Sequence, residues 1–234
     1  MRRAAAWLLR AVAVVSLLGL SYLYAVHRFA VRAEGLPTAV APREASVEGA
    51  SGAVAWPKQT EEHCGSYALA AAIGLATGGR EAPAGEALAP VVSHEVSWSA
   101  RLSGTLPWRI TGAAARRGLL GAAYTARAAP QDRRLDLLKA HIAAGRPTIV
   151  LYESERATQH YVVVVGYGPG AVHLYDPNWL PSPQDARRTE DGNGAAPGNV
   201  TLGDDLFLAR WARGGIAGLY TWWYFPVGVK PEPR

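Results

Sequence analysis

Cys64, the only cysteine in the chain of 234 residues, has the chemistry of a nucleophile if its thiol can ionise. It stands where an apolar, alanine-rich run begins (Cys64–Ala76), and Gly65 follows it. The run predicts a mostly buried helix, and the pKa of a thiol falls at a helix N-terminus or beside a histidine. We therefore interpret Cys64 as a nucleophile and expect Gly65 to leave space for substrate over the sulfur. The alternative is a small cysteine buried in the core.

A histidine and an aspartate in the second half of the chain complement such a nucleophile. His160 opens the apolar run HYVVVVGY, and Asp176 ends the next one, in LYDPNW. The runs 161–166 and 171–175 predict an antiparallel hairpin in which His160 and Asp176 lie directly opposite on one face. There the carboxylate would hold the imidazole in the tautomer that a general base needs. Each residue also has an ordinary interpretation, as a strand-end histidine and a turn aspartate.

Two further side chains are candidates for binding substrate. Gln59, five positions before Cys64, has an amide that can donate to a developing oxyanion beside the backbone N–H of Cys64; otherwise it is a polar loop residue. Trp179, close to Asp176, is predicted to line the substrate cleft. No cluster of histidines, cysteines and carboxylates has metal-ligand spacing, so we expect neither a metal nor another cofactor.

The elements that must position these residues follow from hydrophobic periodicity and turn residues. Besides the helix at 64–76, helices are predicted at 107–117 and 135–144, where proline opens the first and glycine closes both. β-branched and aromatic runs predict strands at 119–126, 148–152, 161–166, 171–175 and 219–227. Residues 177–200 are predicted to form a long polar loop. Helices precede most of the strands, which is typical of an α+β fold.

The charge distribution and an apolar N-terminus predict the location of the protein. Five arginines and no acidic residue lie in residues 1–32 and account for the net charge of +5, so the rest is neutral and no nucleic-acid surface is expected. The uncharged run 11–26, extended back to residue 4, is long enough for a membrane helix. The arginines before it predict a single-pass protein of the inner membrane with its body outside the cytoplasm. The alternative is a signal cleaved near Val31-Arg32-Ala33.

The sequence is thus predicted to have four parts. A signal anchor occupies residues 1–32, and a flexible linker rich in Ala, Pro, Gly, Ser and Glu occupies 33–54. One domain with the candidate site follows at 55–229, and 230–234 form a tail.

The ordered set of candidate residues resembles papain-like cysteine peptidases. It is most similar to the bacterial branch that removes double-glycine leaders from bacteriocin precursors, and to the stand-alone relatives of that branch. In these peptidases a Gln precedes a Cys-Gly at the start of the central helix, a His opens an apolar strand, and an Asp-Pro ends the next strand. The matching positions here are Gln59, Cys64-Gly65, His160 and Asp176-Pro177. Segments 135–151 and 207–215 also resemble stretches of the family.

The resemblance implies a papain-like fold that cleaves peptide or protein substrates. Cys64 would be the nucleophile, His160 the base, Asp176 its orienting partner, and Gln59 part of the oxyanion hole. The interval between Gln59 and Cys64 is slightly shorter than in the family. The leader peptidases are cytosolic domains fused to an export ATPase, whereas this sequence has no phosphate-binding Gly-x-x-x-x-Gly-Lys-Ser/Thr motif, so no fused ATPase is expected. Wall-peptide amidase or transpeptidase chemistry on the same triad, or a catalytically silent binding module, are the alternatives.

Overall fold

The computed structural model describes residues 2–50, 59, 63–78, 105–154, 158–178, 195–215 and 219–229. The helices in these ranges are α1 (Arg2–Ala30), α2 (Cys64–Ala76), α5 (Pro107–Arg116), α6 (Arg134–Ala143) and α7 (Asp204–Ala212). The main sheet has the order β1 (Val31–Ala33), β4 (Ala123–Thr125), β9 (Trp223–Pro226), β5 (Thr148–Glu153), β6 (Gln159–Gly168), β7 (Ala171–Tyr175) and β8 (Val200–Gly203). In addition, β2 (Ala45–Ser46) pairs with β6, and β3 (Leu119–Leu120) pairs with β10 (Gly228–Val229).

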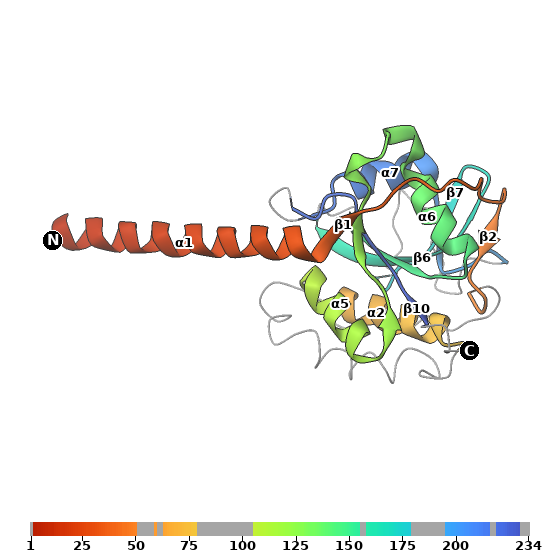
Figure 1. Cartoon of the computed structure of the whole chain (residues 1–234), viewed down its shortest axis with the longest axis horizontal. Coiled ribbons are helices and arrows are strands. Elements are labelled where there is room, and N and C mark those ends of the chain that lie inside the picture. Colours follow the sequence, from red (N-terminus) through yellow and green to blue (C-terminus); the bar gives the residue numbers. More distant parts are fainter. Residues whose placement is uncertain are drawn as a thin grey trace.

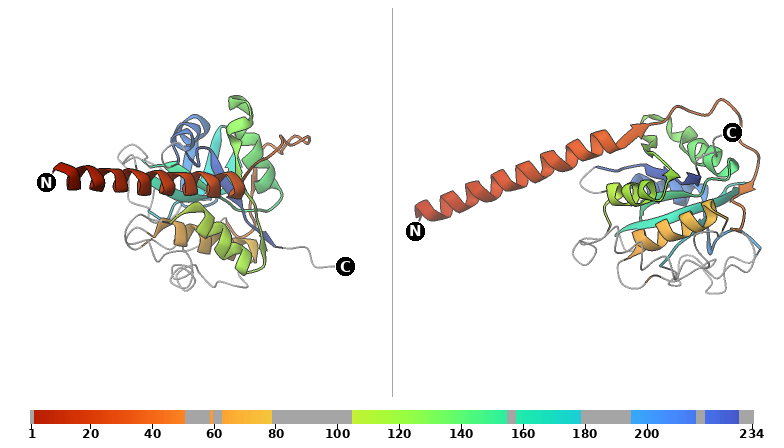
Figure 2. Two further views of the ribbon diagram at one scale, coloured as in Figure 1. Left: turned by 60° about the vertical axis from the view of Figure 1, so that its left-hand side comes forward. Right: turned by 60° about the horizontal axis from the view of Figure 1, so that its bottom comes forward.

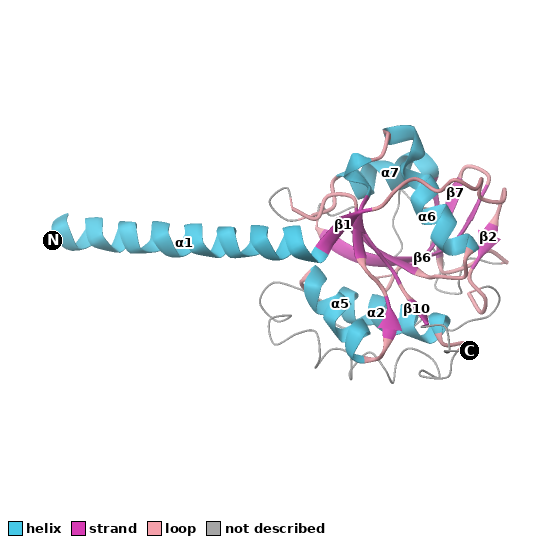
Figure 3. Ribbon diagram, viewed as in Figure 1, coloured by secondary structure: helices cyan, strands magenta, loops and turns pink. Residues whose placement is uncertain are grey.

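The main sheet lies between two layers of helices (Figure 1). α2 and α5 cover one face and α6 and α7 the other, and the view coloured by secondary structure shows the strands between these layers (Figure 3). α1 projects away from the domain in every view (Figure 2). Each described strand pair is antiparallel except β1 with β4. The α+β class predicted from the sequence is confirmed.

α2 forms the central helix because its sequence combines helix propensity with small, apolar side chains. Alanines dominate it, no charge interrupts it, and residues 68–73 are buried. Small side chains allow the helix to approach β6 closely, so it packs against the sheet rather than lying on the surface. It ends at Ala76, where the Thr77 hydroxyl donates to the Ile73 carbonyl at 2.9 Å. This packing brings the first residue of the helix, Cys64, to the sheet.

Most of the predicted elements are present close to their predicted bounds. α2 and β7 match them residue for residue, and α5, α6, β5 and β6 differ by a few residues at their ends. The predicted strand at 119–126 is two short strands, β3 and β4, and the one at 219–227 is confined to β9. α7 and β8 were not predicted from the sequence. α7 has a recognisable start, since two aspartates in its first turn complement the positive end of the helix dipole.

Residues 33–50 are not a free linker, in contrast to the prediction for 33–54. β1 adds to the sheet beside β4, and β2 pairs with the far end of β6. The Val47 N–H donates to the Val165 carbonyl at 2.8 Å, and Val47 is 2% exposed. The segment is held by strand pairing and by a few scattered apolar side chains, among them Leu36 and Val47, which gives no hydrophobic periodicity in the sequence.

Glu34 fastens the start of this segment to the domain. Its carboxylate accepts hydrogen bonds from His141 Nε2 at 2.9 Å and from the Tyr224 hydroxyl. Partial burial acts to raise the pKa of Glu34, but the hydrogen bonds from His141 and Tyr224 and the charges of His141 and Arg146 outweigh it, so the pKa is lowered.

α1 contains the one stretch among the described residues that is long and apolar enough to cross a membrane. This stretch, Ala5–Tyr22, has a mean hydropathy of 1.7, and none of it is buried against the domain. Length and composition alone support a membrane helix here.

Replacing Glu34 with Gln should lower the free energy of unfolding at pH 7 by about 1 kcal/mol, because a partly exposed charge-assisted hydrogen bond is weakened. The lowered pKa gives a stabilising contribution that is present above the ordinary value of 4.5 and is lost as the pH falls through the folded-state pKa. The difference between wild type and Glu34→Gln should therefore shrink toward acid pH in urea unfolding of the detergent-solubilised chain. Glu48→Gln, an exposed change in the same segment, is the control; a Glu34 effect that does not depend on pH would contradict the assignment.

Candidate active site

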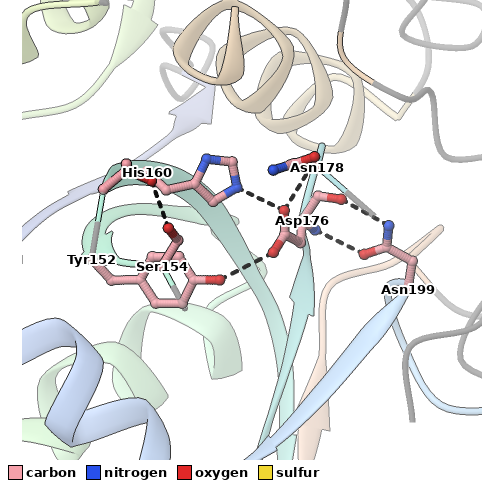
Figure 4. Close-up of polar contacts among 7 residues, drawn as sticks. Tyr152, Ser154, His160, Asp176, Asn178 and Asn199 are labelled. Carbon is pink, nitrogen blue, oxygen red and sulfur yellow. Dashed lines mark hydrogen bonds and ion pairs between the residues drawn. The ribbon is translucent and has the colours of Figure 1, made fainter. Parts of the chain in front are cut away.

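A buried histidine and a buried aspartate form the centre of the candidate site (Figure 4). His160, the second residue of β6, and Asp176, the residue after β7, are 5% and 1% exposed. His160 Nε2 and Asp176 Oδ1 are 2.7 Å apart. Two hydrogen bonds between Ser154 and Thr158, one between hydroxyls and one between backbones, fix the chain just before His160.

A β-bulge sets the register that brings these two side chains together. Near the turn Gly168 pairs with Ala171 and Gly166 with His173, but beyond Val165 the pairs are Val164 with Leu174 and Val163 with Tyr175. This register places Asp176 beside Val162, so His160 is offset from it by two residues along the same face. The predicted arrangement, with His160 directly opposite Asp176, is therefore wrong by two residues, but the shared face is correct. A diagonal neighbour on one face is within reach of an imidazole.

Cys64 approaches His160 from the other structural layer. It is the first residue of α2 and is half-buried, and its sulfur lies close enough to His160 to raise the pKa of the imidazole. Because Nε2 of His160 is engaged with Asp176, Nδ1 is the ring nitrogen available to the sulfur. The backbone N–H groups of Ser66 and Tyr67 bond to the His63 carbonyl, so those of Cys64 and Gly65 precede the first turn of hydrogen bonds in the helix.

Burial and Asp176 act in opposite directions on the titration of His160. Burial by itself lowers the pKa of His160, because it disfavours the imidazolium. The negative charge and the hydrogen bond of Asp176 outweigh this effect, and the neighbouring Cys64 adds to them, which raises the pKa of His160 to about 10. The site therefore favours a positively charged His160 between a carboxylate and a sulfur.

Besides His160, the side chains of Tyr152 and Asn199 hold Asp176, and neither was predicted from the sequence. The Tyr152 hydroxyl donates to Oδ2 at 3.0 Å, and the Asn178 backbone N–H donates to Oδ1 at 2.8 Å. The Asn199 side chain accepts from the Asp176 N–H at 2.8 Å and donates to the Asp176 carbonyl at 2.9 Å (Figure 4). Tyr152 lies in an apolar strand and Asn199 in a Pro-Gly-Asn turn, and neither context marks such a role in the sequence.

Gly198 is required for Asn199 to reach Asp176. Its φ of +72° is one that other residues rarely adopt, and a Cβ there would lie 2.0 Å from the Leu174 carbonyl oxygen. Its N–H donates to the Ala50 carbonyl at 2.9 Å. The chain therefore passes directly against the end of β7 at this point, between β7 and the N-terminal segment.

Gln59, Gly65 and Trp179 are the other residues that the sequence predicts at the site. The Gln59 N–H donates to the Pro177 carbonyl at 2.8 Å, so Gln59 lies next to the residue that follows Asp176. Gly65 is buried, and the position of a Cβ there is occupied by the Thr105 side chain, 2.6 Å away at its nearest atom. The space beside Gly65 is thus filled by protein in the direction of its missing side chain. Trp179 lies outside the described residues. Within the described part of the chain, no three His, Cys, Asp or Glu side chains are grouped as a metal site requires.

Comparison with known families matches residues 57–191, more than half of the sequence, to the peptidase C39-like family. The chain belongs to this family. A chain from Bacillus anthracis described as a C39-like peptidase superposes with a TM-score of 0.50 at 12% identity, over 82% of this chain and 100% of that one. The peptidase domain of Streptococcus ComA, a bi-functional ABC transporter involved in a quorum sensing pathway, gives a TM-score of 0.48 at 14% identity, over 76% of this chain and 99% of that one. No curated protein matches the sequence.

Membership of the peptidase C39-like family confirms the resemblance drawn from the ordered Gln, Cys-Gly, His and Asp-Pro positions. The likeness to the Bacillus anthracis chain is one of fold, and it agrees with the predicted papain-like architecture. Together the family and the fold support a cysteine peptidase.

Replacing Asp176 with Asn should lower the pKa of His160 markedly. The amide keeps the shape of the carboxylate but removes the charge, so burial, which lowers the pKa, is opposed mainly by Cys64. An NMR titration of the imidazole signals would measure the change, with His173 as internal control because burial alone lowers its pKa. An unchanged titration of His160 would show that Asp176 does not control its charge.

Proposed function

We propose that the protein is a cysteine peptidase that hydrolyses peptide bonds with Cys64 as nucleophile, His160 as base and acid, and Asp176 as orienting partner. The observation that carries this proposal is the position of His160, a buried imidazole that is hydrogen-bonded to the Asp176 carboxylate and lies near enough to Cys64, the only cysteine of the sequence, for the sulfur to affect its pKa. A nucleophile, a base and a group that orients the base are the three parts that thiol catalysis needs.

The chemistry follows from the order of the three groups. The thiolate of Cys64 attacks the carbonyl carbon of the scissile bond, and the positive His160 gives its Nδ1 proton to the leaving amine as the C–N bond breaks. The product is a thioester on Cys64. The neutral His160 then takes a proton from water as the water oxygen attacks the thioester, the C–S bond breaks, and the acid product leaves as the Cys64 thiolate and the positive His160 are restored. Asp176 keeps the ring oriented and favours its charged form in both steps.

The proposed oxyanion hole combines the backbone N–H of Cys64 with the side-chain amide of Gln59. The helix supports the first donor, because the N–H groups of its first turn lack intrahelical acceptors and carry the positive end of the dipole. The second is supported by the hydrogen bond between the Gln59 backbone and Pro177, which keeps Gln59 near the site. Such donors stabilise the charge that develops on the carbonyl oxygen. A peptide or protein is the substrate class that the family supports.

We further propose that α1 tethers the domain to the inner membrane, with the domain on the extracytoplasmic side. The stretch Ala5–Tyr22 has the length and hydropathy of a membrane helix. Arg2, Arg3 and Arg10 favour the cytoplasm for its N-terminal end.

Cys64→Ala should abolish peptide hydrolysis and leave the thermal midpoint nearly unchanged, because only one small, half-buried side chain is altered. In the wild type, a thiol-directed peptidase inhibitor should label Cys64 alone, as identified by mass spectrometry of the adduct. Prior labelling should block turnover of a peptide library. Full hydrolysis by Cys64→Ala would end the cysteine-peptidase proposal.

In cells, the chain should fractionate with the inner membrane and resist carbonate extraction. A protease added to spheroplasts should digest the domain while a cytoplasmic marker stays intact. Recovery of a soluble form that begins near Glu34 would instead indicate that the N-terminal segment is a cleaved signal.

A further inference from the structure

Two side chains outside the proposed triad hold Asp176, that of Tyr152 from β5 and that of Asn199 from the turn before β8. We infer that Tyr152 and Asn199 are positioning residues, which fix the carboxylate of Asp176 in the orientation that serves His160. The inference rests on the proposed peptidase function and identifies further residues on which its rate depends.

Tyr152 forms a hydrogen bond to the second oxygen of the Asp176 carboxylate. It pairs directly with His160 across β5 and β6, so both side chains lie on the same face, with ring centroids 5.9 Å apart. Its hydroxyl donates to Asp176 Oδ2, while Oδ1 receives His160 Nε2 and the Asn178 N–H. Rotation of the carboxylate would break hydrogen bonds at both of its oxygens. Because Tyr152 is fully buried, water cannot replace the hydrogen bond that its hydroxyl would lose.

Asn199 holds the backbone of the same residue. Asp176 follows the last residue of β7, where the strand ladder has ended. The Asn199 amide bonds to both the N–H and the carbonyl of Asp176, and its own N–H donates to the Leu174 carbonyl at 2.9 Å. The Asn199 side chain thus satisfies the backbone N–H and carbonyl of Asp176, as a neighbouring strand would, one residue beyond the end of β7.

Both residues act through Asp176 rather than on substrate. Tyr152 is 0% and Asn199 is 1% exposed, so neither offers a surface to a bound peptide. Their loss should therefore change the chemical step and not substrate binding.

The first test is Tyr152→Phe in the full-length protein, assayed on a peptide that the wild type cleaves. We expect kcat to fall about ten-fold with KM unchanged, the scale of one hydrogen bond to a charged group. The acid limb of the pH–rate profile should move to higher pH, because the ionised carboxylate loses a donor that stabilises its charge.

Tyr224→Phe is the matched control. Tyr224 is also a fully buried tyrosine whose hydroxyl donates to a carboxylate, that of Glu34, outside the candidate site. We expect a comparable fall in thermal midpoint for both variants, but an unchanged kcat and pH profile for Tyr224→Phe. Equal kinetic behaviour of the two variants would overturn the inference and leave Tyr152 with a structural role only.

A double-mutant cycle separates action through Asp176 from a general effect. In an Asp176→Ala background, Tyr152→Phe should lower the single-turnover rate by less than two-fold, because the group that it positions is gone. A further ten-fold loss in that background would contradict the inference. If Tyr152→Phe does not fold, the same cycle with Asn199→Ala decides the question. Failure of the peptidase proposal itself is distinguishable, since the wild type would then show no hydrolysis that depends on Cys64.

Discussion

The bond between Asp176 and His160 is made in the interior, where both groups have lost nearly all contact with water. A buried carboxylate and a buried imidazolium each carry a desolvation cost of several kcal/mol, and only close, well-directed partners offset it. Here the carboxylate has His160 on one oxygen, Tyr152 on the other, and a backbone N–H besides. The same partners that make the burial tolerable also remove the freedom of the carboxylate to turn. Stability and orientation of the pair therefore have one physical origin.

The bulge at Val165 allows the hydrogen bond between His160 and Asp176 to form. Successive side chains of a strand point to opposite faces, so a shift of one residue reverses the face of every residue beyond it. Without the extra residue, the register near the turn would continue and place Asp176 beside Val163, with His160 on the opposite face. The bulged residue also offers its carbonyl to Val47 of the N-terminal segment. A segment more than a hundred residues away in the sequence thus supports the geometry of the hairpin.

Within the described residues, that N-terminal segment is attached to the domain from β1, directly after α1, as far as Ala50. It adds β1 to one edge of the sheet, docks Glu34 on His141 and Tyr224, and reaches Ala50, whose carbonyl accepts from Gly198 beside Asn199. Hydrogen bonds therefore attach this segment to the domain at several points, the last of them to Gly198, the residue before Asn199. Because Cys64 comes from α2 on one face of the sheet, the three groups meet only when the helical layer and the sheet are packed together.

Local sequence patterns are sufficient to predict the candidate site residues and the helices and strands that carry them. The helix at 64–76 follows from its alanines and uninterrupted apolar character, and β5, β6 and β7 follow from β-branched runs between turns, because these signals depend on neighbours in the sequence. For the same reason Cys64, His160 and Asp176 were recognisable as an ordered set. The bulge at Val165, the pairing of β1 and β2, and the contacts of Tyr152 and Asn199 with Asp176 had no such signal. The strand pairings and side-chain contacts join segments far apart in the chain, and the bulge, although it lies in a hairpin, is bonded to Val47 more than a hundred residues away; these contacts exist only after the chain has folded.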